Sequence, residues 1–402
     1  MEPLGILINS SPMIGEKTGI GFYVYNLCRE LEQHPEIELT YSHRSQEESS
    51  LSGIGIEDLD NLLKKISKPL KIKFGNYYPA SVAATTYNFF LYPLVALHRR
   101  RIKKEIKSGK LQIYHETRHS ILPDFKKQLA KIRLVADIHD LSPITHPQWH
   151  LKEHVREVNR SIPQLLAADH IITKSNYVRQ EIIERFNVNP DKITAIPNAA
   201  GGAYRQFSGT ELEQAKSHVA TFTDGRPFLL YVGTIEPRKN IITLIDAFCH
   251  LSETYDGDLL LAGGYGWLYQ DILDHAEQTG LHNRIRFLGY ARDETIHALF
   301  NLCDLFVYPS WYEGFGMPAL EAMSCGAVPV VSDCSSLPEV VQDGGAFFDP
   351  NSSDDLASTI LSLLNDQQRL IALKKRASEI SKQYQWPDIA QRVINIYKKV
   401  CT

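Results

Sequence analysis

The sequence is poor in the features that mark secreted, membrane-spanning and zinc-binding proteins. Its 402 residues hold six scattered cysteines and no Cys-x-x-Cys pair, so neither a disulfide framework nor a zinc site is predicted. No apolar run approaches the roughly 20 residues that cross a bilayer. The N-terminal stretch MEPLGILINSSP has no basic flank and too short an apolar run for a signal peptide. We therefore expect a cytoplasmic protein.

A strong excess of charge is also missing. The formal net charge is −4, which argues against a nucleic-acid partner. Hydrophobic residues make up 43% of the chain and charged residues 22%, as is typical of globular proteins. A chain of this length exceeds what one core ordinarily supports, so two domains are expected.

Positive charge is concentrated in one segment. Residues 64–110 hold twelve Lys and Arg but one acid, a local net charge of +11. Aromatic and aliphatic residues precede the basic cluster HRRRIKK. One interpretation is a core helix that ends in a solvated basic turn, which suits the helix dipole. The other is peripheral contact with anionic lipid, where each basic residue contributes about 1 kcal/mol. The second would place the protein at the inner face of the plasma membrane.

The first half of the chain alternates between strand and helix patterns. Strands are expected at 5–9, 111–116, 132–140, 169–175 and 192–198, with a helix at 176–186 between the last two. This alternation is typical of a parallel sheet, whose ligands bind beyond the carboxyl ends of the strands. Polar residues lie at those ends: His115, Glu116, His139, Asp140, Lys174, Ser175 and Asn198.

The second half repeats the alternation without repeating the sequence. The segment from 199 to 227 has one helical piece at 211–220 and is interpreted as a connection. Six strand patterns then follow: FLLYVGT, DLLLAGG, RIRFLGY, LFVYPS, VPVVSD and AFFDP. The predicted fold class is α/β with two Rossmann-like domains. The predicted limits are 1–200 and 201–385, followed by a terminal helix, 386–402, that packs back on the N-terminal domain.

Several stretches together resemble the family-four retaining glycosyltransferases of the GT-B superfold, which have two facing Rossmann-like domains. They are TGIGFYVYNL, ADIHDLSPITHP, YVGTIEPRKNIITLIDAF and VYPSWYEGFGMPALEAMSCGAVPVVSD. The resemblance covers nearly the whole chain in order, and its most specific part is Glu-x7-Glu within the last stretch. It implies transfer of a sugar from a nucleotide diphosphate donor, with retention at the anomeric carbon and without a metal or other cofactor.

Two cations follow the first strand of the second half. A leaving nucleoside diphosphate develops negative charge, which protein cations and backbone amides must stabilise if no metal does so. The resemblance implies this role for Arg238 and Lys239. Many relatives carry Arg immediately after the glycine of this strand, where this chain has Thr234. We expect Arg238 to replace that arginine.

The Glu-x7-Glu stretch supplies two carboxylates around a glycine turn. By resemblance, Glu313 accepts hydrogen bonds from the donor sugar and Glu321 from the ribose. A carboxylate has two acceptor oxygens, which suits neighbouring hydroxyls. The backbone N–H groups of Gly314, Phe315 and Gly316 are expected to face phosphate and sugar.

Five further residues are assigned by the resemblance or by their position. His139 matches an active-site histidine that contacts the donor sugar near the reacting centre. Gly19 and Gly21 open a helix after the first strand and would let the backbone approach the diphosphate or the sugar. Tyr290 and Arg292 lie where backbone amides read the base.

The donor and the acceptor are open. A UDP-hexose such as UDP-glucose ranks first as donor and GDP-mannose second. The acceptor would be a glycan or a lipid-linked oligosaccharide in envelope polysaccharide synthesis. A nucleotide-sugar epimerase and a non-catalytic sugar-nucleotide-binding partner are the alternatives. A phosphorylase would need a longer chain. The Asp-x-Asp strings at 58–60 and 256–258 are interpreted as structural rather than as metal ligands.

Overall fold

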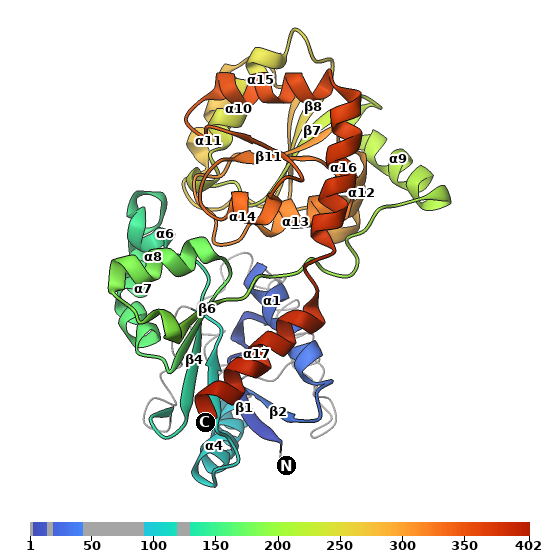
Figure 1. Cartoon of the computed structure of the whole chain (residues 1–402). Coiled ribbons are helices and arrows are strands. Elements are labelled where there is room, and N and C mark those ends of the chain that lie inside the picture. The colour runs from blue at the N-terminus through green and yellow to red at the C-terminus, as the bar shows by residue number, and fades with distance from the viewer. Residues whose placement is uncertain (1–2, 14–18, 43–91, 119–128) are drawn as a thin grey trace, which may run out of the picture. The chain divides into compact units, whose positions relative to one another are not determined.

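The computed structural model describes residues 3–13, 19–42, 92–118 and 129–402 (Figure 1). The chain falls into two compact units. Unit 1 comprises the described parts of 1–137 together with 164–171 and 394–402, and unit 2 comprises 138–163 and 172–393. The predicted domain limits at residues 200 and 385 stay a prediction.

Two parallel sheets of six strands form the framework. The first has the order β2-β1-β3-β4-β5-β6. Its strands are β1 (Leu4–Ile8), β2 (Ile37–Tyr41), β3 (Ile113–Glu116), β4 (Arg133–Ile138), β5 (His170–Thr173) and β6 (Ile193–Ala195). The register pairs Ile6 of β1 with Leu39 of β2 and with Ile113 of β3. The predicted strands of the first half are confirmed.

The second sheet lies within unit 2 and has the order β12-β11-β10-β7-β8-β9. Its strands are β7 (Phe228–Val232), β8 (Asp258–Ala262), β9 (Ile285–Gly289), β10 (Leu305–Tyr308), β11 (Pro329–Ser332) and β12 (Ala346–Phe348). The strand order reverses between β7 and β10, and an open α/β sheet binds its ligand at such a point.

Helices connect the strands, as the alternation predicts. The described α-helices are α1 (Gly19–Leu31), α4 (Tyr92–Lys107), α6 (Ser142–Thr145), α7 (Lys152–Leu166), α8 (Asn176–Phe186), α9 (Gly209–Thr223), α10 (Ile241–Leu251), α11 (Gln270–Gln278), α12 (Asp293–Leu302), α13 (Met317–Ser324), α14 (Leu337–Val341), α15 (Ser353–Leu364), α16 (Gln367–Ser381) and α17 (Trp386–Cys401). Short 3-10 helices include η4 (Pro147–Trp149) and η6 (Pro237–Lys239). The alternation of strand and helix confirms the α/β class.

The central strands of unit 2 are apolar on both faces because helices cover both sides of a parallel sheet. Every residue of β8 and of β10 is buried. Asp258 is a buried acid in β8, and its carboxylate pairs with Arg226 at 2.8 Å and with Arg286 at 3.0 Å. These ion pairs give the Asp-x-Asp string at 256–258 a structural role. The string at 58–60 lies outside the described residues.

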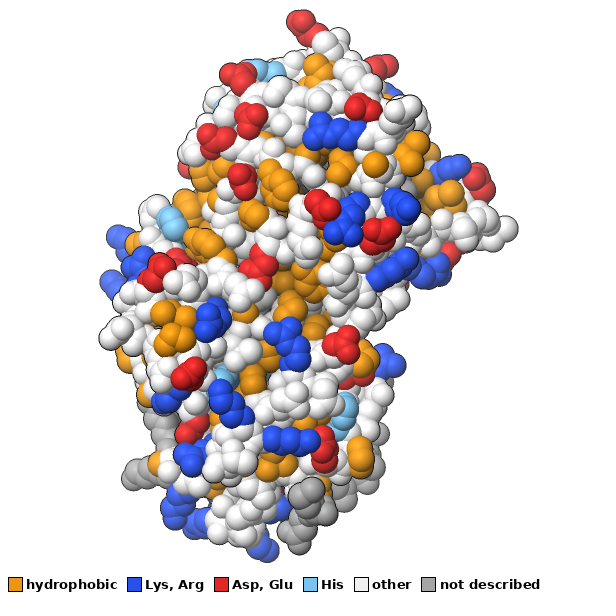
Figure 2. Space-filling view, in the orientation of Figure 1, with side chains coloured by type: hydrophobic (Ala, Val, Ile, Leu, Met, Phe, Trp, Pro, Cys, Tyr) orange, Lys and Arg blue, Asp and Glu red, His pale blue; other side chains and the backbone are white. Residues whose placement is uncertain are grey.

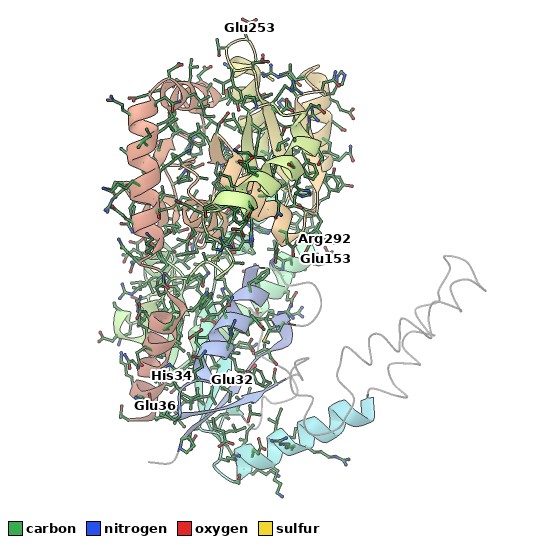
Figure 3. All side chains as sticks on the ribbon, turned by 90° about the vertical axis from the view of Figure 1, so that its right-hand side faces the viewer. Glu32, His34, Glu36, Glu153, Glu253 and Arg292 are labelled. Atoms are coloured by element: carbon green, nitrogen blue, oxygen red, sulfur yellow. The ribbon has the colours of Figure 1, made fainter. Side chains whose placement is uncertain are left out.

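The predicted terminal helix is confirmed as α17, whose last residues belong to unit 1. Tyr397 is fully buried, and its hydroxyl lies 2.7 Å from Nδ1 of His115. Lys398 pairs with Glu36 at 2.8 Å, just before β2 (Figure 3). The other ring nitrogen of His115 lies 3.3 Å from Asp137. His115, a candidate from its strand end, therefore fixes the chain terminus on the sheet.

Basic side chains gather over α4 in unit 1 (Figure 2). Exposed members of this surface are Arg100, Arg101, Lys104, Lys107 and Lys110. Within the described part of the chain, no helix combines the length and the apolar content that crossing a bilayer requires. Residues 64–91 of the basic segment lie outside the described residues, so membrane contact through 64–110 stays a prediction.

Candidate active site

The candidate site lies where the strand order of the second sheet reverses. The chain leaves β7 through Gly233 and Thr234 and enters η6, which carries Arg238 and Lys239. It leaves β10 through residues 309–316 and enters α13. Because β7 and β10 are neighbouring parallel strands, both loops leave the same edge of the sheet.

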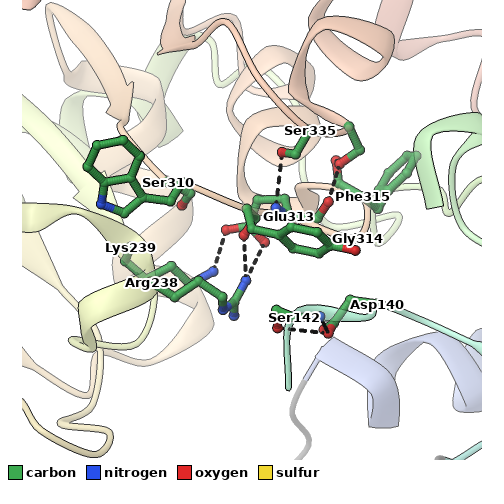
Figure 4. A network of polar contacts seen from close by, with 12 residues as sticks. Asp140, Ser142, Arg238, Lys239, Ser310, Glu313, Gly314, Phe315 and Ser335 are labelled. Carbon is green, nitrogen blue, oxygen red and sulfur yellow. Dashed lines mark hydrogen bonds and ion pairs between the residues drawn. The ribbon is translucent and has the colours of Figure 1, made fainter. Parts of the chain in front are cut away.

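These loops bring the predicted acid and the two predicted cations together (Figure 4). Nζ of Lys239 lies 2.6 Å from Oε1 of Glu313, and Arg238 contacts Oε2 at 3.3 Å. Arg238 also donates to the backbone carbonyl of Tyr312 at 2.7 Å. Arg238 thus lies beside Glu313, and its replacement of the arginine missing at Thr234 stays a prediction.

Two further side chains complete this network, and the sequence did not single them out. Glu236 is buried and pairs with Arg238 at 2.9 Å. The hydroxyl of Tyr308 accepts a 2.8 Å hydrogen bond from Lys239. Glu236 lies two residues before Arg238 in TIEPRKN, and an acid so close to two cations in one loop is the signal that could have identified it.

The cations set the ionisation of Glu313. Burial raises its pKa, but Lys239 and Arg238 outweigh burial and bring the pKa below the ordinary value. Burial, helped by Arg238, lowers the pKa of Lys239. Burial also acts to lower the pKa of Arg238, but Glu313, Asp140 and Glu236 together raise it. Glu313 is therefore a carboxylate at neutral pH, as an acceptor of hydroxyl hydrogen bonds must be.

The glycine turn after Glu313 packs against residue 139. A Cβ added to Gly314 would lie 2.0 Å from the carbonyl oxygen of His139. Gly316 has a φ of 103°, a left-handed conformation that favours glycine. The structure thus places His139, a predicted catalytic residue, against the turn that carries Glu313, and His139 itself is largely buried.

Gly314→Ala is expected to lower the free energy of unfolding by about 3 kcal/mol or more, because the backbone of residue 139 cannot yield to a new methyl group. Urea denaturation measures this change. Gly202→Ala is the matched control, since an added Cβ there meets nothing within 4 Å. A Gly314 variant as stable as the Gly202 variant would contradict the contact.

Hydroxyl groups hold the turn. Ser175 caps α8 by accepting from the backbone N–H of Val178, and it donates to the carbonyl of Gly314 at 2.8 Å. Ser336 donates to the carbonyls of Glu313 and Phe315. Phe315 is buried, so only its backbone can contact a ligand. Ser175 was a candidate from its strand end, and the structure gives it both a capping and a tethering role.

Glu321 lies within α13, as predicted, and is partly buried. Burial, with a smaller contribution from Asp293, raises the pKa of its carboxyl to about 8. Its carboxylate has no hydrogen bond or ion pair with any residue that the structure describes. With a pKa of about 8 the carboxyl holds a proton at neutral pH, and its unused hydrogen-bonding capacity is available to a ligand.

The other predicted binding residues lie in separate elements of the fold. Tyr290 is 70% exposed and follows β9. Arg292 is exposed at the N-terminus of α12 (Figure 3). Gly19 and Gly21 lie in the first turn of α1 in unit 1. Their predicted contacts with a donor stay predictions.

Comparison with known families gives matches along both halves of the chain. The description "Glycosyl transferases group 1" matches residues 213–384, and "Glycosyltransferase Family 4" matches residues 17–200. The O-antigen chain mannosyltransferase B of Escherichia coli is 33% identical over 398 residues, which cover 98% of this chain and 99% of that protein. A glycogen synthase of Mycobacterium tuberculosis is 28% identical over 67% of this chain and 64% of its own.

Solved structures support the fold. A glycosyltransferase from Rickettsia africae has a TM-score of 0.67 at 17% identity and covers 100% of this chain and 99% of its own. The HepE protein of Anabaena, in complex with UDP and glucose, has a TM-score of 0.66 at 18% identity, covering 99% of this chain and 100% of its own. At these identities the likeness concerns the fold alone.

Proposed function

Because the chain belongs to the group 1 glycosyltransferases of family four, we propose that it transfers mannose from GDP-mannose to a growing cell-envelope polysaccharide, with retention and without a metal. The observation that carries the site is the buried Glu313–Lys239–Arg238 network at the carboxyl ends of β7 and β10. The whole-length similarity to an O-antigen mannosyltransferase favours mannose, the donor sugar that the sequence ranks second, over glucose.

In this proposal each group of the network has a separate task. Glu313 accepts hydrogen bonds from donor-sugar hydroxyls, and such bonds to a charged group are worth about 1.5–3 kcal/mol each. Arg238 and Lys239 stabilise the negative charge that develops on the leaving diphosphate. His139 contacts the sugar near the reacting carbon, and Glu321 accepts from the ribose hydroxyls.

All bonds that break or form in the proposed reaction belong to the donor and the acceptor. The anomeric C–O bond to the diphosphate breaks, and the acceptor hydroxyl attacks from the same face. The departing β-phosphate takes the acceptor proton, so no protein nucleophile is needed. A glycan or lipid-linked oligosaccharide supplies the hydroxyl, and the basic surface over α4 supports a lipid-linked acceptor at the inner face of the plasma membrane.

Donor hydrolysis and binding across a panel of GDP-, UDP-, ADP- and dTDP-sugars test the proposal, with and without EDTA. We expect slow turnover of GDP-mannose that EDTA does not change, since side chains and not a metal carry the charge. Turnover of UDP-glucose instead would contradict the proposed donor but support the proposed type of reaction. Tight binding of one donor without turnover, even with acceptor present, would favour the non-catalytic alternative.

A further inference from the structure

Six aromatic side chains of unit 2 are linked by ring contacts and by one hydrogen bond into a row that includes Tyr312, the residue before Glu313. In order, this aromatic row consists of Tyr312, His146, Trp149, Trp267, His150 and His154. The ring of His146 lies 6.0 Å from Tyr312 and stacks on Trp149 at 4.2 Å. Nε1 of Trp267 donates to the carbonyl of Trp149 at 2.5 Å. The row thus joins the segment after β4 to the segment after β8.

The far end of the row is built from histidines around one indole. Trp267 lies 5.6 Å from His150 and 6.4 Å from His154, measured between ring centroids. The two histidine rings are 5.7 Å apart. The row therefore alternates flat apolar faces with ring nitrogens that can donate or accept hydrogen bonds.

The same two segments are unusually rich in exposed apolar side chains. Leu151 is 47% exposed, Tyr265 48% and Leu268 53%. Trp149 and Trp267 are partly exposed. Among the residues that the structure describes, seven large apolar side chains are exposed, and these segments supply three of them. Such a concentration of exposed apolar surface marks a binding site.

Polar contacts tie the row to the candidate active site. Nε2 of His150 lies 3.0 Å from the hydroxyl of Ser142, which donates to Asp140 at 2.9 Å. The Asp140 carboxylate helps to raise the pKa of Arg238 in the active-site network. His150 is 93% buried, and its Nδ1 has no hydrogen-bond partner among the described residues. His150 thus links the row to the active-site network through Ser142 and Asp140.

We propose that the aromatic row binds several consecutive sugars of the acceptor glycan and directs its end to Glu313. A pyranose ring has an apolar face of C–H groups and a rim of hydroxyls. Indole and imidazole faces can stack on the apolar face, and histidine nitrogens can form hydrogen bonds with the hydroxyls. The rings of Tyr312 and His150 are buried, so the partly exposed rings of the row would contact the sugars: His146, Trp149, His154 and Trp267. Several such rings suit a chain better than a single sugar. This inference rests on the proposed transfer to a glycan.

Calorimetric binding of a mannose hexasaccharide and of mannose itself, without any donor, tests the proposal. The wild type is expected to bind the hexasaccharide at least about tenfold more tightly than mannose, because more than one ring stacks on the row. Trp149→Ala and Trp267→Ala are expected to lose about tenfold of the hexasaccharide affinity. Trp267→Phe keeps a ring and should stay within about threefold of the wild type.

Ile371→Ala is the matched control, since Ile371 is an exposed apolar residue of α16 outside the row. It should bind as the wild type does, and thermal unfolding of each variant checks its fold. Equal wild-type affinity for both sugars, or alanine variants that bind like the control, would overturn the proposal. The proposal would also be overturned if the wild type formed dimers without hexasaccharide and the alanine variants did not, because the row would then be a dimer interface. Donor turnover is measured separately, so failure of the proposed reaction and failure of the row are distinguishable.

Discussion

Glu313→Gln is expected to slow sugar transfer by roughly a hundred- to a thousandfold, the range seen when one group that stabilises a transition state is removed. Glutamine keeps the size of the side chain but not its charge. The hydroxyls of the donor sugar lose a charged acceptor, and Lys239 and Arg238, which lie 2.6 Å and 3.3 Å from the carboxylate, lose their shared counter-charge. Initial rates at saturating donor measure the change.

Stability should fall in the same variant. Breaking a buried ion pair by removing one partner costs about 3–5 kcal/mol, because a charge remains buried without compensation. Glu236 still pairs with Arg238 at 2.9 Å, so the loss should fall mainly on Lys239. Glu253→Gln is the control: this glutamate is exposed and labelled in Figure 3. A Glu313 variant with the rate and stability of the Glu253 variant would refute this account of the network.

Glu321→Gln is expected to stabilise the protein at pH 8 and to leave its stability nearly unchanged near pH 4.5. The carboxyl has a folded-state pKa of about 8 against an ordinary value of 4.5. The folded chain therefore holds a proton that the unfolded chain releases above pH 4.5. The contribution of this proton to stability is complete below pH 4.5 and is lost as the pH rises through 8.

The size of the effect follows from the same shift. At about 1.4 kcal/mol per pKa unit, and discounted for partial exposure, the gain at pH 8 is roughly 2–4 kcal/mol. Urea denaturation at pH 4.5 and pH 8 measures it in the variant and the wild type. Above pH 8, where this carboxyl is ionised, the variant should also bind nucleotide about tenfold more weakly, since the ribose loses a charged acceptor. An equal gain at both pH values would mean that ionisation of Glu321 is not the cause.

The sequence predicted all the described strands except β2, because most buried strands are short apolar runs between turn residues. Strand β2 was missed because its sequence, IELTY, mixes polar and apolar residues. It also placed Glu313 before a helix and Glu321 within it, which α13 confirms. It named Lys239 as a cation near the diphosphate, but not its bond to a carboxylate 74 residues away. A contact between side chains so far apart in the sequence depends on the order of the strands in the sheet, which local sequence patterns do not determine.

Other parts of the site were hidden for a different reason. His115 lies near the end of β3 and His139 directly follows β4, yet His115 contacts Tyr397 and His139 packs against Gly314. Their strand-end positions are alike, so only the three-dimensional partners separate them. The aromatic row was equally invisible, because Trp149 and Trp267 are 118 residues apart.

The ending of α17 in unit 1 has a consequence for how the protein is made. Unit 1 contains the first strand of the chain and also residues 394–402. Its buried Tyr397–His115 contact cannot form until residue 397 has been synthesised. Domains generally fold in order of their synthesis, N-terminal first. Here the part that is synthesised first cannot finish folding until residues 394–402, which follow unit 2 in the chain, have also been synthesised.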